Sequence, residues 1–219
     1  MHDSIKNYKE IVNSIESKLK DQNNVKLPTV IAVSKTFKLD KIHPLIDYGH
    51  LHFGENKVQE AVEKWSDIKN QKPEINLHLI GKLQTNKVKN AIKIFDYIHS
   101  LDNEKLAIKI ANEEKKYNKI LKIFIQVNIG DEEQKSGIKK NKLRDFYNFC
   151  KNQKLNIVGL MCIPPADMNP ENYFKEMKTL SNELNLNELS MGMSSDYLIA
   201  VANSSTYLRI GSSIFGPRS

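Results

Sequence analysis

This sequence of 219 residues contains little cysteine and no long apolar run. Its two cysteines, Cys150 and Cys162, form no CxxC pair and have no matching pair of histidines, so neither a disulfide framework nor a zinc site is expected. No segment approaches the roughly 20 apolar residues that a membrane-spanning helix requires, and residues 1–20 lack the apolar core of a signal peptide. We therefore expect a cytoplasmic protein with two buried thiols, no bound metal and no membrane association.

The sequence also lacks a concentrated basic patch, despite a formal net charge of +7. Its lysines are spread through every helical segment and do not alternate with aromatic residues in one stretch. Lysine-rich solvated helix faces explain this distribution better than a nucleic-acid interface does. We expect no specific nucleic-acid partner, and a basic nucleic-acid-binding protein is the weakest of three candidate functions for this chain.

The apolar pattern predicts one helix followed by eight strands. Apolar residues recur at three- and four-residue steps from Ile5 to Leu19, which indicates an amphipathic helix within residues 1–22, packed outside the rest of the fold. Eight short apolar or alternating runs follow, and lysine- and glutamate-rich helical segments separate most of them. These runs are Thr29–Val33, His50–Phe53, Asn76–Leu79, Tyr97–His99, Ile120–Val127, Ile157–Leu160, Glu188–Met191 and Thr206–Ile210.

Eight strands that alternate with helices favour an α/β fold, a (β/α)8 TIM barrel. An open doubly wound sheet is the alternative, but the first strand leads into Ser34-Lys35-Thr36-Phe37 and not into a glycine-rich dinucleotide turn. No linker and no change of composition divides the chain. Residues 1–219 are therefore expected to form a single barrel domain.

Lys35 is the most unusual residue, because it directly follows the apolar run 29–34. An amine held against apolar surface has its charged form disfavoured, and the neutral amine is the form that attacks a carbonyl to give a Schiff base. The alternative is a lysine that merely ends a strand in solvent.

Other unusual residues also fall where strands are expected to end, which is the functional face of such a barrel. They are Gly54-Glu55-Asn56, the segment 81–87, Asn128, Met161, the segment 192–196 and the segment 209–213. The last two segments follow strands seven and eight, and their glycines and serines are suited to hold a phosphate, with free N–H groups at the starts of the following helices. Each serine is also an ordinary helix N-cap, so a structural role stays open.

Arg209 lies inside the apolar run 207–210, where its guanidinium needs an acceptor. A cofactor ring nitrogen and a carboxylate inside the barrel are both possible acceptors. The histidines have no ligand spacing, and we assign none of them to metal or acid–base chemistry. They are His2, His43, His50, His52, His78 and His99.

Seven segments together resemble the YggS/PROSC family of pyridoxal phosphate homeostasis proteins, in order and with family-like spacing from about Val30 to Arg218. They are Ile31–Lys35, Phe53–Glu60, His78–Lys87, Lys135–Gly137, Gly159–Met161, Leu189–Asp196 and Arg209–Gly216. The resemblance implies an alanine-racemase-like barrel of PLP fold type III, without the C-terminal β domain of alanine racemases, because this chain ends at Ser219.

The resemblance also implies the cofactor and its site. The lysine that matches Lys35 holds pyridoxal 5′-phosphate (PLP) as a Schiff base, and the other matching residues surround the cofactor. Ser194, Gly211 and Ser212 are expected at the phosphate, Arg209 near the pyridine nitrogen, and Asn56 and Met161 beside the ring. An arginine at the pyridine nitrogen leaves that nitrogen unprotonated, which weakens the electron sink that amino-acid chemistry uses.

We therefore expect a carrier that buffers PLP through Lys35 and takes part in intracellular vitamin B6 and amino/keto-acid homeostasis, without robust catalysis and with no catalytic residue established. A PLP-dependent amino-acid racemase or related enzyme is the alternative. Partners implied are PLP and PLP-requiring apo-enzymes, and the protein is expected to be a monomer. Lys135, after the fifth strand, is either a transient acceptor of PLP during transfer or a solvated loop lysine. Lys82 and Lys87 are expected at the rim of the site, where they either bind anions or only contribute surface charge.

Overall fold

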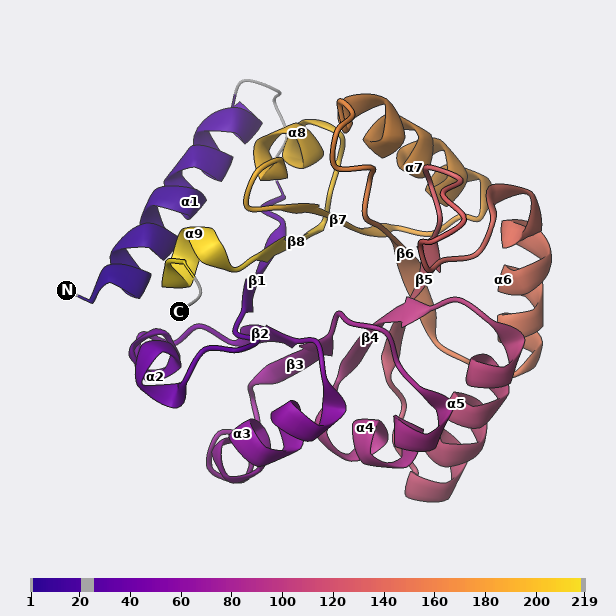
Figure 1. Ribbon diagram of the computed structural model, residues 1–219, viewed down its shortest axis with the longest axis horizontal. Helices are drawn as coiled ribbons and strands as arrows, with labels where there is room; N and C mark the ends of the chain where they lie inside the picture. Colours follow the sequence, from indigo (N-terminus) through magenta and orange to yellow (C-terminus); the bar gives the residue numbers. More distant parts are fainter. Residues whose placement is uncertain (1, 21–25, 218–219) are drawn as a thin grey trace.

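Eight parallel strands close in chain order into a barrel, with β1 hydrogen-bonded to both β2 and β8 (Figure 1). The computed structural model describes residues 2–20 and 26–217. The strands are β1 (Thr29–Val33), β2 (His52–Glu55), β3 (Asn76–Leu79), β4 (Tyr97–Leu101), β5 (Lys122–Val127), β6 (Ile157–Cys162), β7 (Glu188–Met193) and β8 (Tyr207–Ile210). The predicted TIM barrel is confirmed, and the doubly wound alternative is wrong.

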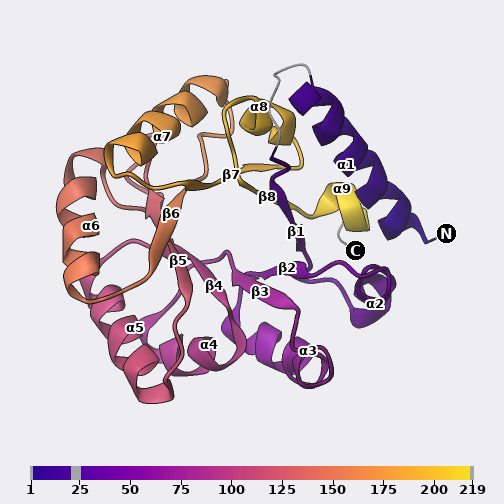
Figure 2. The same ribbon diagram turned by 180° about the vertical axis from the view of Figure 1, so that it is seen from behind.

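Helices surround the barrel, and most of them follow a strand, as a right-handed parallel crossover requires. They are α1 (Asp3–Lys20), α2 (Leu39–Asp47), α3 (Val58–Gln71), α4 (Val88–Ile94), α5 (Glu104–Tyr117), α6 (Leu143–Asn152), α7 (Glu171–Glu183), α8 (Tyr197–Ala202) and α9 (Ser212–Phe215), with short 3-10 turns η1 (Thr85–Lys87) and η2 (Lys140–Lys142). Helix α1 lies outside the ring and packs against α2, α8 and α9 (Figures 1 and 2). Residues 21–22 of the expected first helix lie outside the described residues.

The main hydrophobic core lies between the strands and the helices that cover them, as expected for parallel strands. The barrel interior is mixed, with a small cluster of Tyr97, Phe124 and Met161 beside buried histidines. Ile31 and Ala32 of β1 are fully buried, and so are Ile123 and Ile125 of β5. Each α-helix buries one stripe of apolar side chains in the main core. Cys150 on α6 and Cys162 on β6 are both buried free thiols, as the sequence predicted.

Four strands run further than the apolar pattern indicates. Strand β2 extends through Glu55, β4 through Leu101, β6 through Cys162 and β7 through Met193. Gly54, Glu55 and Met161 therefore lie within strands, whereas the sequence placed them just after strands. Pairing with neighbouring strands explains the extension, since Glu55 is in register with Leu79 and Met161 with Ser190.

The described helices include none that combines the length and the apolar character needed to cross a bilayer.

Candidate functional site

A pocket of about 470 Å³ opens where the strands end at their carboxyl side. Six of the residues predicted for the site line it, and they come from the ends of β1, β2, β7 and β8. These six are Lys35, Asn56, Ser194, Arg209, Gly211 and Ser212. The volume falls in the range of small-molecule sites, and the position is the one that TIM barrels use for ligands.

Lys35 stands in a tight turn that is fixed on both sides. The preceding residue, Ser34, donates its backbone N–H to the carbonyl oxygen of Gly54 over 2.9 Å. The following residue, Thr36, has a φ of 67° and donates its N–H to Oε1 of Glu60 over 2.6 Å. The Lys35 side chain is partly buried and lines the pocket. The turn therefore holds the base of the lysine in one place.

A buried carboxylate beneath this turn ties β1 to β2 and α3. Oε1 of Glu55 accepts hydrogen bonds from the hydroxyl of Ser34 at 2.7 Å, from Nε1 of Trp65 at 2.9 Å and from Nζ of Lys64 at 3.0 Å. Burial raises the pKa of Glu55, while the Trp65 hydrogen bond and the Lys64 charge oppose that rise. Its second oxygen, Oε2, is buried and has no hydrogen-bond partner in the described part of the chain.

Lys64 connects that carboxylate to the backbone next to Lys35. Its ammonium donates to the carbonyl oxygen of Ser34 at 2.9 Å, to Glu55 at 3.0 Å and to Glu60 at 2.9 Å. All three partners help to set the turn that carries Lys35. Lys64 therefore supports the site from outside the pocket.

Arg209 enters the pocket from β8 and is only 5% exposed. Its Nη1 donates to the carbonyl and hydroxyl oxygens of Ser190 at 2.6 and 2.7 Å, and Nη2 donates to the carbonyl oxygen of Cys162 at 2.8 Å. Burial lowers the pKa of Arg209 and raises the pKa of the neighbouring Cys162 thiol to about 12. Among the described residues, no carboxylate contacts the Arg209 guanidinium. The Asp196 carboxylate acts on it only through its charge.

The loops after β7 and β8 meet at one side of the pocket. Oδ1 of Asp196 accepts the N–H of Met193 at 2.6 Å, which closes the turn after β7, and the N–H of Ser213 points to the hydroxyl of Ser194 at 3.4 Å. Gly192, at φ +93°, lies against α8, where a Cβ would stand 2.6 Å from Cβ of Ala200. Hydroxyls and backbone of two loops thus gather at the predicted phosphate site.

The loop after β3 forms the opposite wall. A Cβ at Gly81 would lie 2.4 Å from the carbonyl oxygen of Asn56, so only glycine permits this approach. Lys82, the next residue, lines the pocket and is exposed, whereas Lys87 is not among the lining residues.

Two further residues named from the sequence, Met161 and Lys135, are not among those that line the pocket. Met161 is fully buried inside the barrel with Tyr97 and Phe124, because its position on β6 directs it into the interior packing. Lys135 lies beside the rim, where its Nζ donates to the carbonyl oxygen of Pro164 at 3.2 Å and pairs with Glu132. The adjacent Ser136 does line the pocket.

Sequence reasoning missed Gln126, which lines the pocket from β5 and donates to the carbonyl oxygen of Ser136 at 3.2 Å. A lone amide within the apolar strand 122–127 was the available signal. No group of three or more histidine, cysteine or acidic residues suited to a metal ion occurs in the described ranges 2–20 and 26–217.

Comparison with known proteins gives consistent matches over the length of the chain. The family described as "Alanine racemase, N-terminal domain" matches residues 12–219. The pyridoxal phosphate homeostasis protein of Pasteurella multocida is 36% identical over 219 residues, covering 95% of this chain and 93% of that protein. The protein of the same name from Haemophilus influenzae is 38% identical over 221 residues, with 95% and 92% covered.

Two solved structures are similar to the barrel of this chain. PipY of Synechococcus elongatus, with PLP bound, superposes with a TM-score of 0.80 at 33% identity, covering 92% of this chain and all of that chain. An alanine racemase of Clostridium difficile superposes with a TM-score of 0.71 at 14% identity, covering 94% of this chain and 55% of that chain. The second likeness shows a shared fold and no more.

Proposed function

Since this chain belongs to the family of pyridoxal phosphate homeostasis proteins, we propose that it binds PLP reversibly in the pocket at the ends of β1, β2, β7 and β8. The observation that carries the proposal is that Lys35, Arg209 and the Ser194–Gly211–Ser212 group line one pocket. An amine, a fixed cation and a cluster of hydroxyls and glycines match the three functional groups of PLP, namely an aldehyde, a ring nitrogen and a phosphate.

The residues fit the cofactor on features of this chain alone. PLP supplies an aldehyde that condenses reversibly with a primary amine, with loss of water. Lys35 is the partly buried amine at the pocket, and its turn is held by Ser34 and by the Glu60 carboxylate. The hydroxyls of Ser194 and Ser212 and the backbone at Gly211 would hold the phosphate, while Asn56 would contact the ring. Met161 would act on the ring only through the packing beneath it.

Arg209 decides what the bound cofactor can do. A guanidinium donates hydrogen bonds and accepts none, so a ring nitrogen beside Arg209 acts as the acceptor and stays without its own proton. That arrangement favours holding the cofactor over strong carbanion chemistry. We infer a carrier that limits free PLP and serves vitamin B6 and amino/keto-acid homeostasis in the cytoplasm, as a monomeric single-domain protein that hands PLP to apo-enzymes.

The absorption spectrum of the purified protein after incubation with PLP tests the binding proposal. We expect a visible band that borohydride removes, followed by a mass increase that maps to the peptide containing Lys35. Lys35→Ala should abolish the band and the covalent label. Lys82→Ala, which removes an exposed lysine at the same pocket, should keep both; a label on another lysine in the parent protein would refute the assignment.

An amino-acid racemase is the competing function, and proton exchange separates it from a carrier. Incubation with single L-amino acids in heavy water should give no appreciable exchange at Cα for a carrier. Fast exchange that is abolished in Lys35→Ala would replace the carrier by an enzyme.

A further inference from the structure

A continuous chain of hydrogen bonds runs behind Arg209 through the barrel interior. The hydroxyl oxygen of Ser190 lies 2.7 Å from Nη1 of Arg209 and 2.8 Å from Nδ1 of His99. Nε2 of His99 lies 2.9 Å from Nδ1 of His78, and Nε2 of His78 lies 3.0 Å from Nδ1 of His52. Five residues from β2, β3, β4, β7 and β8 are thereby joined.

The chemistry of Arg209 sets the direction of every bond in this chain. A guanidinium only donates, so the Ser190 hydroxyl accepts from it, and Nδ1 of His99 is the acceptor that the described contacts offer for the single hydroxyl proton of Ser190. His99 then carries its proton on Nε2 and donates to His78, and His78 likewise donates to His52. The consistent arrangement therefore has all three imidazoles neutral, with the proton on Nε2.

The surroundings keep the inner imidazoles uncharged. His78 and His99 are fully buried, and their rings stack on Tyr97 and Phe124 with centroids 4.1 and 4.3 Å apart. Burial lowers the pKa of both well below the usual value, reinforced by neighbouring imidazoles for His78 and by the Arg209 charge for His99.

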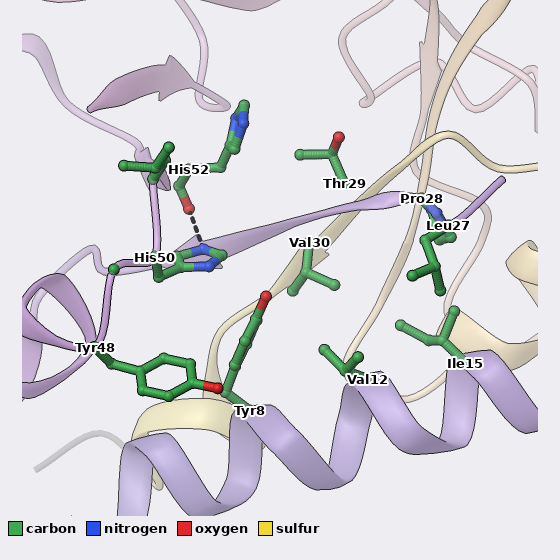
Figure 3. A pocket seen from close by; sticks show the side chains of 12 residues that line it. Tyr8, Val12, Ile15, Leu27, Pro28, Thr29, Val30, Tyr48, His50 and His52 are labelled. Atoms are coloured by element: carbon green, nitrogen blue, oxygen red, sulfur yellow. Dashed lines mark hydrogen bonds between the residues drawn. The ribbon is translucent and has the colours of Figure 1, made fainter. Parts of the chain in front are cut away.

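His52 ends the chain at the opposite side of the barrel. It lines a pocket of about 530 Å³ at the amino ends of β1 and β2, beneath α1, together with Tyr8 and His50 (Figure 3). Burial and the Lys122 ammonium lower the pKa of His52, and the Asp96 carboxylate opposes them; His50 and Tyr97 complete the polar groups around it.

We propose that Ser190, His99, His78 and His52 are positioning residues for Arg209: their hydrogen bonds have one fixed direction and hold the guanidinium at the pocket without neutralising its charge. A buried arginine is usually balanced by a carboxylate, which would cancel the charge offered to a ligand. Here hydroxyl and carbonyl oxygens accept hydrogen bonds from Arg209, and the imidazoles continue this series of hydrogen bonds and polarise it. The full positive charge remains directed at the pocket. This inference rests on the proposed PLP function.

The tautomers of the three histidines provide a direct test that needs no cofactor. A long-range proton–nitrogen NMR correlation on the cofactor-free protein at neutral pH should show His52, His78 and His99 neutral and protonated at Nε2. Either His78 or His99 protonated at Nδ1, or carrying a charge, would overturn the proposal.

Two substitutions at the far end test whether the chain is continuous. His52→Gln retains an oxygen that can accept from His78, so the tautomers of His78 and His99 should persist. His52→Leu removes the last acceptor, so we expect the Nε2–H proton of His78 to lose its hydrogen-bonded chemical shift while the proton stays on Nε2, because His99 still donates to Nδ1. Identical His78 spectra in the two variants would show that the chain does not include His52.

Substitutions at Ser190 test the effect on Arg209 with PLP present. Ser190→Ala should weaken PLP binding about tenfold, as expected for one lost hydrogen bond to a charged group, and should shift the pH dependence of the cofactor's visible band. Ser190→Thr, which keeps the hydroxyl, should restore both. An unchanged affinity and pH profile in Ser190→Ala would refute the positioning role. If Ser190→Ala does not fold, His52→Leu is compared with His52→Gln in the same PLP titration. We expect the pH dependence of the visible band to shift in His52→Leu and not in His52→Gln. Equal pH profiles in these two variants would refute the positioning role.

The outcomes separate this inference from the proposed function. If the histidines have the expected tautomers but the protein does not bind PLP, the proposed function is rejected and the directed hydrogen bonds are retained. PLP bound at Lys35 with different tautomers would reject only the role of the chain.

Discussion

Nζ of Lys64 donates a 2.9 Å hydrogen bond to the carbonyl oxygen of Ser34, the residue directly before Lys35. Lys64 lies on α3 and does not line the pocket. The lysine proposed to hold the cofactor thus depends on a second lysine, which stays ion-paired with Glu55 and Glu60 and fixes the turn from below. In the proposed function Lys35 binds the aldehyde, and Lys64 supports the turn that carries it.

We expect Lys64→Met to destabilise the fold and to slow the reaction of PLP with Lys35. The substitution leaves the buried Glu55 carboxylate without its ammonium, which costs about 3–5 kcal/mol in the free energy of unfolding, measurable by urea denaturation. Lys57→Met, at an exposed position just before α3, should change neither property. Adding Glu55→Gln to Lys64→Met should recover much of the lost stability, and a failure to do so would show that the carboxylate is not the source of the cost.

Stability should fall as the pH drops below about 6.5. Burial lowers the pKa of His50 to about 4 and lowers the pKa of His78 and His99 well below the usual value. Below about pH 6.5 the unfolded chain binds protons at these histidines and the folded chain does not, so the unfolding free energy decreases by up to about 1.4 kcal/mol per pH unit for each. For His50 the decrease ends near its folded pKa.

Urea denaturation at a series of pH values measures this slope. His50→Gln removes one titrating group and should make the slope shallower by that amount. His43→Gln, at an exposed site on α2, should leave the slope as it is. A parent protein equally stable at about pH 7.5 and about pH 5 would contradict the neutral state of the buried histidines.

Gly81→Ala should reduce PLP affinity while the protein still folds. The added Cβ would lie 2.4 Å from the carbonyl oxygen of Asn56, so the loop after β3 must move away from the pocket wall. Fluorescence or absorbance titration with PLP measures the loss. Gly49→Ala is the matched control, because it strains a φ of +95° but meets nothing within 4 Å and lies away from this pocket. Equal affinities in both variants would show that the Asn56–Gly81 contact does not shape the site.

Lys135→Ala tests the proposed transfer role of the rim lysine. If Lys135 accepts the aldehyde in transit, loading and release of PLP should slow by the same factor, leaving the equilibrium affinity unchanged. Stopped-flow absorbance measures loading, and capture of released PLP by an excess of a competing amine measures release. Lys139→Ala, an exposed lysine four residues further on, serves as control; unchanged rates in Lys135→Ala would leave Lys135 as a loop lysine paired with Glu132.

Much of the site was predictable because barrel geometry places every strand's carboxyl end on one face. Once eight strands were recognised, Lys35 after β1 and the serine-rich segments after β7 and β8 had to approach one another. The site residue Gln126 was missed because a single polar residue in an apolar strand does not reveal which way it points. Met161 was placed after its strand for a related reason: the strand runs two residues beyond the apolar pattern, and the side chain of Met161 packs inside the barrel.

The sequence by itself determined the barrel, the order of its strands and the position of Lys35, since local periodicity specifies strands and helices and a parallel βα repeat has few ways to close. Only the tertiary structure decided what supports the site. His99 and Ser190 are 91 positions apart in sequence yet share a hydrogen bond of 2.8 Å, and Ser34 meets Lys64 across 30 positions. Such contacts depend on the register and closure of the barrel, which bring together side chains that no local pattern links.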